Sequence, residues 1–80
     1  MTFLFQITIR QRGRDLDYNV YEFNLHPGKF KAELITPASN GFTQGVIFWK
    51  EISGWRIQPL SQEAERLAQR LIWELEQRTS

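Results

Sequence analysis

The chain has 80 residues, ten of them basic and nine acidic, and a formal charge of +1. This length suits one domain and excludes two separate cores, and the balanced charge does not by itself indicate a polyanion partner. With no cysteine and one histidine, disulfides, thiol catalysis and thiolate metal sites are excluded, and we expect no metal or other cofactor. We expect a single domain over residues 1–80, small enough to gain stability by association.

The beginning of the chain shows neither a basic segment nor an apolar run long enough for a signal peptide. No stretch approaches the roughly 20 apolar residues of a membrane-spanning helix. We therefore expect a cytoplasmic protein with no membrane partner.

The first half of the chain is predicted to form three strands. Apolar and polar residues alternate over residues 3–10, which is typical of a strand with one buried face. A turn over residues 11–15 leads into a second predicted strand, residues 17–25. The His-Pro-Gly sequence at 26–28 then reverses the chain, because proline presets φ and glycine accepts positive φ. Residues 30–35 form the third predicted strand.

The second half is predicted to complete the sheet and add a helix. Residues 37–41 form the longest loop, and the apolar run 46–49 is typical of a central strand covered on both faces. Ser53-Gly54 turns the chain into a short last strand, residues 55–58. Pro59 ends the sheet, and Ser61 is expected to cap a helix over residues 61–78.

The predicted helix carries one apolar stripe, formed by Leu60, Ala64, Leu67, Ala68, Leu71, Ile72 and Leu75. Short connections favour antiparallel neighbours. The predicted fold class is therefore α+β: a four- or five-stranded antiparallel meander sheet, residues 3–58, with one C-terminal amphipathic helix packed on one face.

The sheet face opposite the helix is the first candidate functional surface. The residues expected beneath the helix are Phe3, Phe5, Ile7, Ile9, Phe23, Phe30 and Leu34. Leu4, Val20, Ile35 and one apolar pair, either Val46 with Phe48 or Ile47 with Trp49, would then point away and form a patch of about several hundred Å². The alternative is that sheet twist and long polar side chains cover the patch, or that the strand register slips by one residue.

Trp73 is the second candidate, since it lies opposite the apolar stripe of the helix. Its helical neighbours are Arg70 and Gln77, with Arg66 two turns back. Tryptophan and arginine are enriched at interaction hot spots, which favours an interface anchor. The alternative is a tryptophan lying on its own helix in a cation–π contact with Arg70, or one folded over the last strand.

The arginines at positions 10, 12 and 14 are the third candidate. If the first hairpin extends through them they share one side, where guanidinium groups suit phosphates. Tyr21, Trp49 or Trp55 would then offer stacking surfaces for unpaired bases. The alternative is an ordinary solvated turn, because Asp15 and Asp17 follow directly and the pI of about 8.2 is low for a nucleic-acid binder.

No catalytic constellation is recognisable. His26 sits beside Pro27-Gly28, where turn geometry explains it, and no nucleophile motif or metal-ligand spacing accompanies it. The sequence therefore predicts a protein that is not an enzyme.

The predicted function is a small protein-interaction module, such as an adaptor, inhibitor or regulatory subunit, with itself as a homodimer or another protein as partner. Its interface is predicted to contain Trp73, Arg66, Arg70, Gln77, Leu4, Ile35 and Trp49. The alternative is a single-stranded nucleic-acid binder that uses Arg10, Arg12, Arg14, Tyr21 and Trp55.

Overall fold

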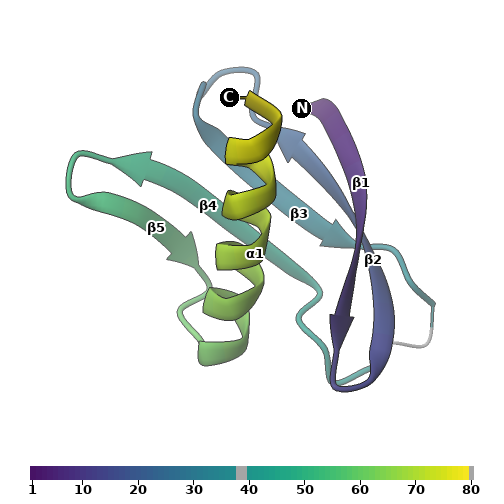
Figure 1. Ribbon diagram of the computed structural model, residues 1–80. Coiled ribbons are helices and arrows are strands. Elements are labelled where there is room, and N and C mark those ends of the chain that lie inside the picture. The colour runs from purple at the N-terminus through teal and green to yellow at the C-terminus, as the bar shows by residue number, and fades with distance from the viewer. Residues whose placement is uncertain (38–39, 80) are drawn as a thin grey trace.

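The computed structural model describes residues 1–37 and 40–79, which form an antiparallel sheet with one helix across a single face (Figure 1). Each strand pairs with the next one in sequence, in the order β1-β2-β3-β4-β5. The elements are β1 (Thr2–Gln11), β2 (Arg14–Glu22), β3 (Lys29–Leu34), β4 (Gly45–Glu51), β5 (Gly54–Gln58) and α1 (Gln62–Thr79). The predicted meander with a C-terminal helix is confirmed.

The first hairpin is tighter than predicted. Gln11 pairs with Arg14, so only Arg12 and Gly13 form the turn, with φ angles of 48° and 76°. Positive φ at both central residues defines the type I′ turn, whose twist matches that of the flanking strands. The second strand therefore begins at Arg14 and ends at Glu22, three residues earlier at each end than predicted.

The core lies between the helix and the sheet face that carries Phe5, Ile7 and Ile9. Their register partners on β2 are Val20, Tyr18 and Leu16, and all six are buried. Val20 is therefore covered, and the prediction that it faces away is wrong.

The prediction that Phe3 lies beneath the helix is also wrong. A bulge between Phe3 and Phe5 inserts Leu4 into β1, so Phe3 pairs with Tyr21 on the opposite face and remains 54% exposed. Strict alternation fails here because one extra residue in a strand reverses every side chain beyond it.

Strand β4 resolves the alternative left open by the sequence. Val46 and Phe48 are buried in the core with the helix residues, and Ile47 and Trp49 lie half-buried on the other face. The expectation that this strand is covered on both faces is wrong, because α1 packs across β4 and β5 on one face only.

The helix begins as predicted. The Ser61 hydroxyl accepts a hydrogen bond from the Ala64 N–H at 3.1 Å, which satisfies one of the free amides of the first turn. Ala64, Leu67, Ala68, Leu71 and Leu75 are buried against the sheet, with Ile72 partly buried beside them. Leu60 is 88% exposed because it precedes the helix, so its place in the apolar stripe was predicted wrongly.

Candidate functional site

A groove of about 780 Å³ runs between the edge of β1 and the first half of α1. Five consecutive residues, 8–12, line it from β1 and its turn, and Arg66, Leu67 and Arg70 line it from the helix. The helix backbone approaches β4 and β5 rather than β1, which leaves this gap between α1 and the first strand. Leu67, with 2% of its surface exposed, forms an apolar floor.

The groove is strongly basic in an otherwise balanced chain. Arg10, Arg12, Arg66 and Arg70 line it, together with one carboxylate, Glu63. The groove thus gathers four of the ten basic residues and one of the nine acidic ones. Concave surfaces lined by one sign of charge concentrate ligands of the opposite sign.

The four arginines differ in how they are held. Arg10 pairs with Asp15 at 3.3 Å, and Arg70 pairs with Glu74 at 3.1 Å. Both pairs lie at the surface, with Glu74 half-buried, and surface ion pairs contribute little and are exchanged readily. Arg66 makes no hydrogen bond or ion pair with any residue that the structure describes, and its guanidinium is available to a ligand.

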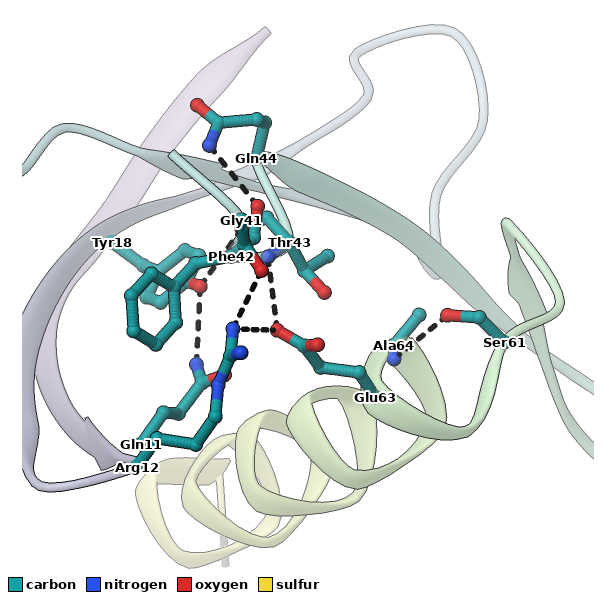
Figure 2. A network of polar contacts seen from close by, with 10 residues as sticks. All are labelled: Gln11, Arg12, Tyr18, Gly41, Phe42, Thr43, Gln44, Ser61, Glu63 and Ala64. Atoms are coloured by element: carbon teal, nitrogen blue, oxygen red, sulfur yellow. Dashed lines mark hydrogen bonds and ion pairs between the residues drawn. The ribbon is translucent and has the colours of Figure 1, made fainter. Parts of the chain in front are cut away.

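One end of the groove is closed by a polar network (Figure 2). The Arg12 guanidinium donates to the Gly41 carbonyl at 2.5 Å and lies 3.6 Å from the Glu63 carboxylate. The same carboxylate accepts the Thr43 N–H at 3.1 Å. These contacts tie the hairpin tip, the loop before β4 and the first turn of the helix together, so they set the separation of the two groove walls.

Tyr18 anchors this network from the core. Its hydroxyl accepts from the Gln11 amide at 3.1 Å and donates to the Thr43 carbonyl at 2.9 Å (Figure 2). Burial, which penalises the phenolate, raises the pKa of Tyr18, and the nearby Glu63 charge raises it further. Tyr18 therefore stays neutral and keeps both hydrogen bonds throughout the physiological pH range.

Trp73 lies on the exposed side of α1 as predicted, with 54% of its surface accessible. The Arg70 guanidinium lies 5.1 Å from its ring centroid, a cation–π contact on the helix surface. Of the other predicted interface residues, Arg66 faces the groove and Gln77 is exposed further along the helix. The structure thus brings Arg66, Arg70 and Trp73 together beside the groove.

Leu4, Ile35 and Trp49 do not join that surface. Leu4 packs partly buried against the core, so the prediction that it faces away is wrong, because the bulge in β1 changes the alternation there. Ile35 is 42% exposed where its N–H donates to the Asp17 carbonyl. Trp49 lies on the open face of the sheet, away from α1.

The arginines of the first hairpin do not share one side, contrary to the prediction. Arg10 pairs across the hairpin with Asp15, and Arg14 pairs with Gln11 at the next position, which faces the other way. Arg12 sits in the turn itself. Arg12 and Arg14 lie over the Phe42 ring, at 4.1 Å and 5.7 Å from its centroid.

The aromatic residues predicted to stack with bases are elsewhere. Tyr21 is seven positions from Arg14 along β2, a separation of about 23 Å at the usual rise of a strand. Trp55 is half-buried on the helix side of the sheet, where its ring packs 5.9 Å from Phe48 and 6.3 Å from Phe30. The structure therefore does not assemble the predicted nucleic-acid site.

The open face of the sheet carries a small aromatic cluster. Phe3 packs edge-on to Tyr21 at 5.8 Å. The Lys29 ammonium lies 5.4 Å from the Phe23 ring and 5.3 Å from the Trp49 ring. The prediction that Phe23 lies beneath the helix is therefore wrong, because β2 ends one residue before Phe23, which is not part of the core. A long polar side chain thus covers part of this face, as one of the two sequence-based alternatives expected.

Polar contacts continue beside that cluster. Glu51 accepts from Arg56 at 2.9 Å and from the Trp49 indole at 3.1 Å, and these bonds, the Arg56 one first, hold the pKa of Glu51 below its usual value. The open face is a mixed polar and aromatic surface rather than a continuous apolar patch.

Two features of the groove had no counterpart in the sequence reasoning. Phe42 was not singled out, although its ring supports two arginines. Glu63 was not identified as a candidate either, although its carboxylate accepts the Thr43 N–H. Glu63 lies three positions before Arg66 in the sequence. An acidic residue near an arginine is a common pattern, so it does not indicate the contact with the Thr43 amide.

Within residues 1–37 and 40–79, no cluster of three or more His, Asp or Glu residues is arranged to hold a metal ion. The helix of the described chain is not long and apolar enough to cross a membrane. No protein-family model, curated protein or solved structure matches the chain.

Proposed function

We propose that this protein is a non-enzymatic interaction module that binds an acidic segment of a partner protein in the groove between β1 and α1. The observation that carries the proposal is that Arg12, Arg66 and Arg70 line one groove from its two walls, with Arg66 unpaired among the described residues. Arg10 adds a positive charge at the β1 edge of the same groove. Guanidinium groups bind carboxylates in bidentate geometry, so an acidic polypeptide is the complementary ligand.

The shape of the groove supports a polypeptide rather than a single small anion. Its volume of about 780 Å³ is far larger than one carboxylate needs, and Leu67 offers an apolar floor between the charges. Trp73 and Arg70 stand at the helix side, and both are residue types enriched at interaction hot spots.

The test is a titration of the isotopically labelled protein with poly-L-glutamate, followed by backbone NMR at low salt. We expect shift changes confined to residues 8–12 and 62–73, and weaker binding as salt is added, because exposed charges are screened. A titration with no shift changes, or with changes on β3 and β5 alone, contradicts the proposal.

A parallel titration with oligo-deoxythymidine separates the nucleic-acid alternative. We expect it to perturb the groove less than poly-L-glutamate does at equal charge, since no exposed aromatic platform faces the groove from β1. Tighter binding of the oligonucleotide, with shifts at Tyr21 and Trp49, would replace the proposal with single-strand recognition by the open face.

Self-association is the second candidate, and Phe3 favours it. More than half of Phe3 is exposed on the open face, where its ring packs edge-on to Tyr21 at 5.8 Å. A homodimer formed through this face would bury Phe3 and leave the arginine groove free for another partner. Sedimentation velocity over a range of protein concentrations tests it, and a monomer at every concentration contradicts it.

A further inference from the structure

The exposed edge of β1 forms one wall of the groove, and this determines how a ligand is held. Side chains of successive strand residues point to opposite faces, so Thr8, Ile9, Arg10 and Gln11 line one hollow only if the groove follows the backbone edge. β1 has a single neighbour, β2, among the described strands. The outer amides and carbonyls of residues 8–11 thus face the groove.

β1 is less protected than an edge strand usually is, because its bulge at Leu4 lies away from the groove-lining residues 8–12 and Arg10 is its one charged residue. At ten residues it is the longest strand, and it contains neither proline nor lysine. The opposite edge, β5, has five residues and is followed directly by Pro59. Edges of natural sheets are normally shortened, charged or covered, and a long uncovered one is a template for another strand.

The charge of the groove selects the occupant. The segment Thr2–Gln11 contains no carboxylate and one arginine, so a second copy pairing through β1 would bring a further basic strand against Arg66 and Arg70. Like charges held close together oppose that arrangement. An acidic segment from another protein meets no such repulsion.

The spacing of the helix arginines matches an extended chain. Arg66 and Arg70 are one turn apart, about 6 Å along the helix axis. Alternate side chains of a strand are about 6.6 Å apart. Figure 1 shows that α1 and β1 run in opposite directions, with the N- and C-terminal ends near each other. Residues of both elements line the groove.

We infer that the partner segment binds as an added β-strand on the edge of β1, with acidic residues at alternate positions facing Arg66 and Arg70. This inference rests on the proposed function and specifies its geometry. Backbone hydrogen bonds to β1 supply affinity, and the two arginines select carboxylates on one side of the added strand, as in other cases of strand addition.

The test uses a fluorescently labelled eight-residue peptide in which Glu alternates with Val, and a matched isomer with four Glu followed by four Val. Two further versions of the alternating peptide carry N-methyl groups. One is methylated at the odd-numbered amides and the other at the even-numbered amides. In an added strand, one set of amides bonds to β1 and the other faces away, so methylation of one set lowers affinity about tenfold per lost hydrogen bond. Methylation of the other set is expected to change affinity less than about twofold.

Hydrogen exchange provides the second measurement. On binding the alternating peptide, amides at alternate positions of β1 are expected to become protected, while those of α1 are unchanged. A charge exchange completes the design: the Arg66→Glu and Arg70→Glu double variant is expected to lose the glutamate peptide and to bind a peptide in which Lys alternates with Val.

The outcomes separate the two claims. If the alternating and block peptides bind equally and neither methylation pattern matters, strand addition is overturned and the acidic-groove proposal stands. If neither glutamate peptide binds at low salt, both are overturned. If methylation of only one set of amides lowers peptide affinity, and amides along β1 become protected from exchange, both strand addition and the acidic-groove proposal are supported.

Discussion

The two faces of the sheet differ in what covers them and in how their charges are arranged. The face under α1 is buried and ends in a groove where Arg12 is fixed by Gly41 and Glu63. The open face holds Phe3 packed edge-on to Tyr21, and Lys29 lies over the rings of Phe23 and Trp49. Both faces are rich in aromatic residues, so composition alone does not distinguish them. The covering helix creates the difference, because it excludes water on one side and adds a second wall with its own charges.

The largest expected difference between the faces is in stability. Leu67→Ala removes a buried side chain under the groove and is expected to cost about 2–5 kcal/mol of unfolding free energy. The matched control, Ile47→Ala on the open face, is expected to cost about 1 kcal/mol, because this side chain is only half-buried. Urea denaturation measures both. Equal losses would show that the open face is as well packed as the core.

The second comparison concerns the polar network behind the groove. Tyr18→Phe leaves the Thr43 carbonyl without its donor and is expected to cost about 1–2 kcal/mol at neutral pH. Tyr21→Phe on the open face removes one hydrogen bond of 3.3 Å from Asn19, at an expected cost of about 0.5 kcal/mol. Thermal melts of the two variants compare these losses directly.

Tyr18 also makes stability depend on alkaline pH. Its pKa in the folded chain is raised above the ordinary 10.0, so the unfolded chain loses this proton first. The stabilisation that comes from this pKa difference is complete below about pH 10. The unfolding free energy then falls as pH rises towards the pKa that Tyr18 has in the folded chain. Urea midpoints between pH 9 and pH 11 should decline less steeply in Tyr18→Phe than in the wild type. Parallel declines would assign the effect to other groups.

A dimerisation assay also distinguishes the open face from the groove. If the open face forms the homodimer, Phe3→Ser is expected to weaken dimerisation about tenfold. The phenyl ring is exposed in the monomer, and its burial in the dimer would be lost in the variant. Arg66→Gln is expected to leave the dimer unchanged. Sedimentation equilibrium measures both, and a dimer that responds to Arg66→Gln instead would move the contact to the groove.

The smallest expected effect is the loss of one groove charge. Arg66→Gln is expected to weaken poly-L-glutamate binding about two- to fivefold, the usual range for one exposed ion pair. Lys50→Gln removes the same charge from an exposed position on β4 and is the matched control. Fluorescence anisotropy at two salt concentrations measures the difference. Equal weakening by both variants would indicate attraction to the whole surface rather than to the groove.

The order of the elements was determined by the sequence alone. Alternation identified the first and third strands, glycine-containing turns separated the strands, and a helical stripe after a serine cap identified α1. These features are local, because side-chain period and turn geometry depend on residues within a few positions of each other. The exposure of Trp73 followed from the same periodicity.

The tertiary structure decided which face each strand buries and which distant residues meet. One bulge at Leu4 reversed Phe3, and one two-residue turn separated Arg10 from Arg14. The groove depends on where α1 crosses the sheet, and its walls come from residues about 55 positions apart in the chain, such as Arg10 and Arg66. Local pattern carries no information on such pairs, because the packing of the whole core sets the distance between β1 and the helix.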